Sequence, residues 1–144
     1  MKAVLPIRIA SVLTFVHAAL HTIGGVFGKT PPGPATLVLA TMRANPIQVF
    51  GVTRTFWDFY HGMGLGVSIS LTAESIVMWQ LASLAKTTAP QLRPILATFL
   101  LAYLALAVNS YLYFFAGPVI TEILIAACFA WAIAAAKPAT AIAT

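Results

Sequence analysis

The sequence predicts an all-α integral membrane protein in which four helices cross the bilayer as a bundle. Of its 144 residues, 60% are hydrophobic and 8% are charged, and the mean hydropathy is +0.94. A water-exposed domain carries roughly 25% charged residues, so this chain has too little polar surface for a soluble globule. Four stretches reach the roughly 20 mostly apolar residues that a spanning helix needs. They lie at about residues 5–27, 56–84, 94–115 and 118–136 of a single membrane domain, residues 1–144.

Prolines and glycines mark the joints between these spans. The link Gly117-Pro118 is so short that the third and fourth helices are expected to be antiparallel neighbours. The outer loop, residues 28–55, opens with three prolines and two glycines between residues 28 and 34. Residues 35–44 can form a short helix but cannot span, and Asn45-Pro46 breaks it. This segment predicts an interfacial or re-entrant cap, with an extended loop as the alternative.

The basic residues predict the orientation of the chain. In a four-span protein the N-terminal end, the second loop and the C-terminus share one side, and they hold Lys2, Arg8, Lys86, Arg93 and Lys137. The longer first loop holds only Lys29, Arg43 and Arg54. Because short cytoplasmic loops carry an excess of Lys and Arg, we expect a multi-pass protein of the bacterial inner membrane with both termini in the cytoplasm.

The ionisable residues exclude some functions and suggest others. Eight Lys and Arg residues spread over the chain form no phosphate-reading patch, so no nucleic-acid partner is expected. A lone Cys128 excludes an internal disulfide and a CxxC motif. The three acids, Asp58, Glu74 and Glu122, and all three histidines fall in the predicted spans. Ionisable residues inside a membrane usually face the protein interior and often carry function.

Most of these residues are predicted to form one layer in the outer leaflet. His17 and His21 are four residues apart, and Asp58 and His61 three apart, so each pair shares a helix face. If the first helix runs outward and the second inward, His21 and His61 lie about 9 Å and 7 Å from their outer ends. The layer draws on all four helices: His21, Asp58, His61, Asn109 and Glu122, with His17 one turn deeper.

Several chemistries fit this layer. His17, His21, His61 and Asp58 could bind a transition metal such as Zn, Fe, Mn or Cu, whereas axial ligation of a haem or chlorin is a further alternative. Without a metal, the layer could bind an amine or hydroxyl of an amphipathic ligand or supply acid–base groups. That ligand-binding set is Asp58, His61, Asn109, Glu122 and Tyr113. Each histidine has a structural alternative, as a neutral imidazole donating to a carbonyl or hydroxyl between helices.

Three further features accompany the layer. Glu74 lies about 20 Å deeper, where it is either protonated and hydrogen-bonded, for instance to a Ser or Thr hydroxyl, or part of a proton or ligand path. Arg54 precedes Asp58 by four residues, which predicts an interfacial ion pair. Gly62 and Gly66 form a small-residue ridge that predicts close helix packing.

Aromatic residues gather near both ends of the predicted spans. Trp79 and Trp131 fall toward one side, and the larger set toward the other: Phe56, Trp57, Phe59, Tyr60, Tyr111, Tyr113, Phe114 and Phe115. These sets are typical of interfacial aromatic belts. The larger set could also form a ligand cage around the polar layer.

The run Arg54–Leu65, RTFWDFYHGMGL, resembles a family of small, uncharacterised four-helix bacterial membrane proteins. In that family a Trp-Asp-Phe run, followed by an aromatic or His and a glycine, opens the second helix. The resemblance implies the four-helix architecture and carries no activity. A second similarity is to the sterol-isomerase-like and sigma-2-receptor-like proteins, whose intramembrane acids bind amine or sterol ligands. Their motifs are not matched residue by residue, so they imply no site residues here.

The leading functional hypothesis is an outer-leaflet His/carboxylate pocket that binds a metal ion or a small amphipathic ligand. One alternative is a membrane-embedded enzyme that acts on a lipid-like substrate with the same residues. Another is an accessory transmembrane subunit of a larger membrane complex, including one that bears haem or pigment, or a homo-oligomer. The lipid bilayer is the partner common to all three.

Overall fold

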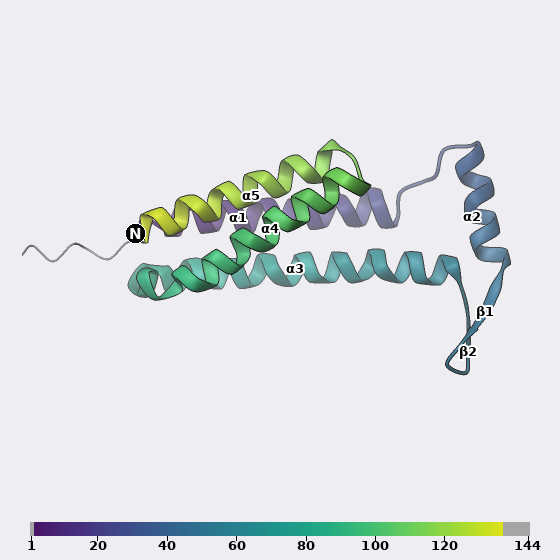
Figure 1. Cartoon of the computed structure of the whole chain (residues 1–144), viewed down its shortest axis with the longest axis horizontal. Coiled ribbons are helices and arrows are strands. Elements are labelled where there is room, and N and C mark those ends of the chain that lie inside the picture. The colour runs from purple at the N-terminus through teal and green to yellow at the C-terminus, as the bar shows by residue number, and fades with distance from the viewer. Residues whose placement is uncertain (1, 137–144) are drawn as a thin grey trace, which may run out of the picture. The chain divides into compact units, whose positions relative to one another are not determined.

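The computed structural model describes residues 2–136 and is mostly helical (Figure 1). The elements are α1 (Val4–Leu20), the π-helix η1 (His21–Val26), α2 (Pro34–Ala44), β1 (Pro46–Val49), β2 (Val52–Thr55), α3 (Phe56–Thr88), the 3₁₀-helix η2 (Ala89–Leu92), α4 (Arg93–Tyr113) and α5 (Ala116–Ala135). The long helices begin and end within a few residues of the four predicted stretches. The chain forms two compact units, unit 1 up to His17 and from Leu71 onward, and unit 2 from Ala18 to Ser70.

Three helical stretches in the described part of the chain are long and apolar enough to cross a membrane. They are Val4–Val26, Phe56–Tyr113 and Ala116–Ala135. The second has 58 residues and runs through α3, η2 and α4. A straight helix of that length would measure about 87 Å, far more than a hydrocarbon core of roughly 30 Å.

The 58-residue stretch folds back on itself at η2. The Tyr103 hydroxyl on α4 donates to Glu74 Oε2 on α3 at 2.8 Å. These two residues lie at nearly equal distances along the chain from the start of η2, so α4 runs antiparallel to the second half of α3 (Figure 1). Pro90 and Pro94 stand in the first turns of η2 and α4, where the missing N–H is tolerated and the preceding helix is interrupted.

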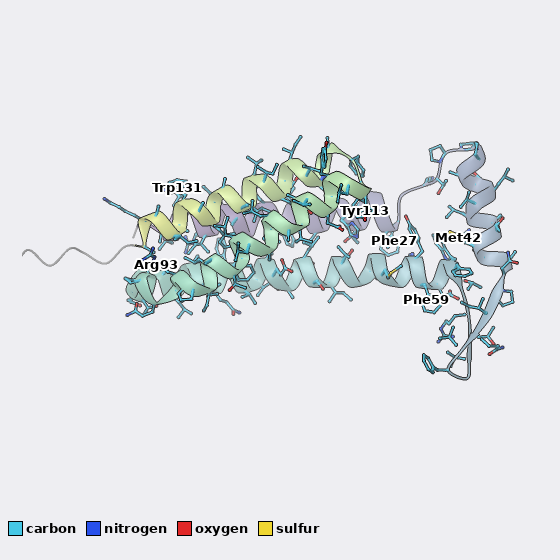
Figure 2. All side chains as sticks on the ribbon, viewed as in Figure 1. Phe27, Met42, Phe59, Arg93, Tyr113 and Trp131 are labelled. Carbon is cyan, nitrogen blue, oxygen red and sulfur yellow. The ribbon has the colours of Figure 1, made fainter. Side chains whose placement is uncertain are left out.

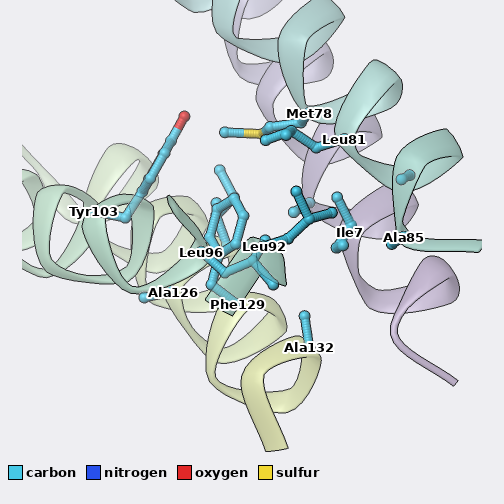
Figure 3. Packing of buried hydrophobic residues seen from close by; sticks show 13 residues of the cluster. Ile7, Met78, Leu81, Ala85, Leu92, Leu96, Tyr103, Ala126, Phe129 and Ala132 are labelled. Carbon is cyan, nitrogen blue, oxygen red and sulfur yellow. The ribbon is translucent and has the colours of Figure 1, made fainter. Parts of the chain in front are cut away.

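Unit 1 is held together by one buried cluster to which four helices contribute (Figure 3). The cluster contains Ile7, Ala10, Met78, Leu81, Ala82, Ala85, Leu92, Leu96, Tyr103, Ile125, Ala126, Phe129 and Ala132. Its alanines let helix backbones approach closely. Phe129 fills the space among them, with its ring stacked on Phe99 at 5.2 Å between centroids.

Two buried side-chain contacts position α1 along α3 within unit 1. The Ser11 hydroxyl donates to the Ser75 carbonyl at 2.8 Å. One turn further on, Thr14 Oγ1 lies 3.5 Å from the Met78 sulfur. Both contacts are buried, and Thr14 Oγ1 also lies 3.2 Å from the Tyr103 hydroxyl on α4.

Unit 2 contains a short antiparallel hairpin that the sequence did not predict. The predicted short helix forms α2, and β1 then pairs with β2, with Pro46 opposite Thr55 and Val49 opposite Val52. The connecting residues Phe50 and Gly51 have φ of 47° and 83°, the left-handed pair that a two-residue hairpin turn needs. A bulky residue is uncommon at positive φ, so Phe50 gave no turn signal.

The close helix approach predicted at Gly62 and Gly66 occurs at Gly64 instead. A Cβ at Gly62 or Gly66 would meet no atom within 4 Å, whereas one at Gly64 would lie 3.2 Å from Val26 Cγ2. The face of α3 that packs within unit 2 is therefore rotated from the one the glycine spacing predicted.

Candidate functional site

Asp58 takes part in capping the N-terminus of α3. Its Oδ2 accepts from the Thr55 backbone N–H at 2.7 Å and from the Thr55 hydroxyl at 2.9 Å, while the Asp58 N–H lies 3.2 Å from Thr55 Oγ1. This reciprocal pattern is a capping box, in which the N-cap side chain and the third helical residue satisfy each other's backbone donors. Arg54 belongs to β2, and its Nη1 donates to the Thr53 carbonyl. The Asp58 carboxylate is thus already engaged in local structure.

We expect Asp58→Ala to lower the free energy of unfolding, because the Thr55 backbone N–H at the start of α3 loses its acceptor in the capping box. Reversible unfolding in mixed detergent micelles would measure the change. Asp58→Asn is the matched control, since an amide oxygen can still accept from the Thr55 N–H, and it should retain most of the stability. Equal stability of Asp58→Ala and the parent would contradict the capping role.

His61 belongs to a stack of rings at the head of α3. Its ring lies 5.3 Å from that of Trp57 with an interplanar angle of 24°, and 5.8 Å from that of Phe27 in an edge-on arrangement. The Arg43 guanidinium, from α2, lies 4.2 Å from the Trp57 ring centroid. The stack ties α2 and the end of η1 to the first turns of α3 within unit 2. His61 is therefore engaged in packing.

His21 has the structural role that was its alternative in the sequence. Its Nε2 donates to the Gly64 carbonyl at 3.1 Å, and Ser68 donates to the same carbonyl at 3.2 Å. Beside them the Thr22 hydroxyl lies 2.7 Å from the Ala18 carbonyl and 2.8 Å from Ser68 Oγ. These contacts join the end of α1 and η1 to α3 within unit 2.

The predicted metal site is not supported. Among residues 2–136, no group of three or more His, Cys, Asp or Glu side chains could hold a metal ion. In unit 2 the three predicted ligands have other partners: His21 contacts the Gly64 carbonyl, Asp58 contacts Thr55, and His61 stacks on Trp57. His17, the fourth predicted ligand, is half-buried on α1 in unit 1.

Glu122 is the predicted site residue that lies inside the protein. It is 5% exposed, and its Oε1 accepts from the Ser110 hydroxyl at 3.0 Å. Its Oε2 is buried and has no hydrogen-bond partner in the part of the chain that the structure describes. Asn109 and Tyr113, the two α4 residues predicted to join it, are exposed. A helix turns by about 100° per residue, so the inward position on α4 belongs to Ser110 and not to Asn109.

One of the two roles predicted for Glu74 was a hydrogen-bonded acid, for instance with a Ser or Thr hydroxyl as its partner. Glu74 is hydrogen-bonded in the structure, but the donor is the Tyr103 hydroxyl. Since the Tyr103 proton points to Glu74, the contact of 3.2 Å between Tyr103 and Thr14 has the Thr14 hydroxyl as donor. Three helices of unit 1 thus meet in one polar chain. Tyr103 is almost fully buried and Glu74 only half-buried.

Unit 1 also carries a groove of about 350 Å³ between α1 and α3. It is lined by Ser11, Val12, Phe15, Ser75, Ile76, Trp79 and Gln80. The Arg8 guanidinium lies over the Trp79 ring, 4.8 Å from its centroid. The sequence did not indicate this groove, because α1 and α3 are far apart in the chain.

Sequence reasoning also missed Ser110, Tyr103 and Thr55. Tyr103 and Ser110 are seven residues apart on α4 and share its buried face, so their spacing was a usable signal. Thr55 and Asp58 match the capping-box spacing of a Ser or Thr followed three residues later by an acid. No local pattern indicated that Thr14, on α1, would join Tyr103.

In comparisons with known proteins, no family model matches the chain, and no curated protein or solved structure matches it significantly. This result is consistent with the resemblance of the Arg54–Leu65 run to small uncharacterised membrane proteins. No activity comes to this chain from a relative, and only its own residues bear on its function.

Proposed function

We propose that this chain is a multi-pass protein of the bacterial inner membrane that binds a small amphipathic ligand through the carboxyl group of Glu122. In this proposal α1 with η1, α3, α4 and α5 cross the bilayer as a four-helix bundle with both termini in the cytoplasm. The distribution of Lys and Arg supports this orientation, because Lys2, Arg8, Lys86 and Arg93 fall on the cytoplasmic side of such a bundle. Lys137, counted with them, lies outside the described residues.

The observation that carries the ligand proposal is the half-satisfied carboxyl of Glu122. Leaving a buried polar atom without a partner costs roughly 1–3 kcal/mol, and such atoms in native proteins usually have a partner from outside the chain when none lies within it. The Ser110 hydroxyl occupies one oxygen only. A hydroxyl or amine on a ligand would supply the hydrogen bond that Glu122 Oε2 lacks.

The surroundings of Glu122 favour a ligand that is largely apolar. Glu122 is about 9 Å from the start of α5 by helical rise. The end of α4 and its connection to α5 carry exposed aromatic side chains: Tyr111, Tyr113, Phe114 and Phe115 (Figure 2, where Tyr113 is labelled). Aromatic residues pack well against the apolar part of a ligand while the polar tip reaches a carboxyl. A metal ion is not proposed, since no cluster of ligands among residues 2–136 supports one.

The test is the identification of molecules that remain bound to the full chain purified from bacterial membranes in mild detergent. We expect mass spectrometry of the extract to find one hydroxyl- or amine-bearing amphiphile at close to one per chain. Glu122→Gln should retain roughly tenfold less, which corresponds to about 1.4 kcal/mol of binding free energy. Glu122→Leu, which removes both oxygens, should retain none.

Glu74→Gln is the matched control, because it changes the other mid-helix acid of unit 1 in the same way and should leave the bound amount unchanged. Equal retention by the parent and both Glu122 variants would overturn the proposal, as would a parent that retains no such molecule. The enzyme and accessory-subunit hypotheses stay predictions, since no described contact tests them.

A further inference from the structure

We propose that the groove between α1 and α3 binds one anionic phospholipid, with the phosphate at Arg8 and an acyl chain along the groove. This inference requires that the helices of unit 1 cross a bilayer, as proposed above, and is independent of any ligand at Glu122. It rests on the position of Arg8, on the lining of the groove and on the charge at that end of unit 1.

Arg8 is a cation inside an apolar helix. It is the fifth residue of α1, about 6 Å from the start of the helix by rise. Its guanidinium lies over the Trp79 ring, with Cζ 4.8 Å from the ring centroid. Its Nε is buried and has no hydrogen-bond partner among residues 2–136. The Arg8 guanidinium thus has a donor that no described residue uses, and a guanidinium can bind a phosphate in a bidentate manner.

The groove next to Arg8 suits an acyl chain. Trp79 connects Arg8 to the groove, because the Arg8 guanidinium lies over the Trp79 ring and the Trp79 side chain lines the groove. The other apolar walls are Val12, Phe15 and Ile76. The Ser11 hydroxyl, which also lines the groove, already donates to the Ser75 carbonyl, so it offers no free donor to a hydrocarbon chain. The volume of about 350 Å³ lies within the range of small-molecule sites.

The charge at this end of unit 1 favours an anionic headgroup over a zwitterionic one. Lys2 and Arg8 lie at the start of α1, Lys86 near the end of α3 and Arg93 at the start of α4. Those turns contain no Asp or Glu. A basic residue near a membrane surface favours anionic lipids by a factor of about five.

The test uses quenching of Trp79 fluorescence by brominated lipids. The full chain carrying Trp57→Phe and Trp131→Phe is reconstituted in phosphatidylcholine vesicles that contain brominated phosphatidylglycerol or, in parallel, brominated phosphatidylcholine at equal mole fraction. We expect the relative binding constant from quenching to favour phosphatidylglycerol about five-fold. Arg8→Gln should reduce this preference to about one, and Arg8→Lys should keep part of it.

Arg93→Gln is the matched control, because it removes the same charge at the same end of unit 1 (Figure 2 labels Arg93). It should lower the preference by less than Arg8→Gln does, because the Arg8 guanidinium, and not that of Arg93, lies over Trp79 beside the groove. An equal loss in Arg93→Gln would indicate general surface charge and overturn the site. Equal quenching by the two brominated lipids in the parent would also overturn it. So would the absence of quenching by either lipid, the result expected if a second copy of the chain covers the groove. Circular dichroism and vesicle flotation of every variant separate these outcomes from loss of folding or of membrane insertion.

Discussion

Replacing Phe129 by alanine is expected to lower the free energy of unfolding by roughly 3 kcal/mol, the largest loss we anticipate from any single substitution in unit 1. The Phe129 side chain is 0% exposed. Its ring is stacked on Phe99 with an interplanar angle of 10° and lies 6.1 Å from that of Tyr103. In the proposed membrane bundle, helices are held together by packing and not by exclusion of water, so the cavity left by the ring accounts for most of the loss.

The measurement is reversible unfolding as the fraction of denaturing detergent in mixed micelles rises. Phe114→Ala is the control, because Phe114 is an aromatic residue of the same unit that is 64% exposed. Its truncation should change stability by less than about 0.5 kcal/mol. If the two variants unfold at the same detergent fraction, Phe129 is not the centre of the packing described for unit 1.

In unit 2, Gly28→Ala is expected to destabilise the last turn of η1 by roughly 3 kcal/mol. A Cβ on Gly28 would overlap the carbonyl oxygen of Gly24 and lie 2.9 Å from its carbonyl carbon. Both atoms belong to the backbone, so no side-chain rotation relieves the overlap and the turn itself must open. The amides of η1 (His21–Val26) should then lose about a hundredfold of their protection from hydrogen exchange.

Gly24→Ala provides the opposite case on the same turn. A Cβ there would meet no atom within 4 Å, and alanine favours a helix over glycine by up to about 1 kcal/mol. Protection of the η1 amides should therefore stay the same or rise. Loss of protection in both variants would show that the two glycines matter for flexibility and not for close approach.

The helices of this protein could be predicted from the sequence because their signals are local. Apolar length sets each helix, and prolines such as Pro34 and Pro94 mark where the next helix begins. The hairpin between α2 and α3 could not be predicted in the same way. Its turn depends on Phe50, whose residue type is unfavourable for the conformation that it adopts.

For the candidate site, residue count along a helix predicts how deep a side chain lies but not which way it faces or what it contacts. The depth of a side chain in a helix follows from its residue count from the helix end. The direction in which it points changes by about 100° from one residue to the next, so an error of one residue moves it to another face. That difference separates the exposed Asn109 from Ser110, which binds Glu122. Depth also says nothing of nearer partners, and Asp58 found one three residues away in Thr55.

The buried contacts of α1 have a consequence for the order of events during synthesis. Ser11 bonds Ser75, and Thr14 contacts Met78, each across 64 positions of sequence. At roughly 5–20 residues per second, a ribosome needs several seconds to make the chain in between. For that time α1 exists without the acceptor of its Ser11 hydroxyl, and the partner of the Thr14 hydroxyl, Tyr103, is made later still, 89 positions away. Most of the residues made in that time belong to unit 2, residues 18–70, so the length of unit 2 largely sets the delay before α1 can contact the second half of α3.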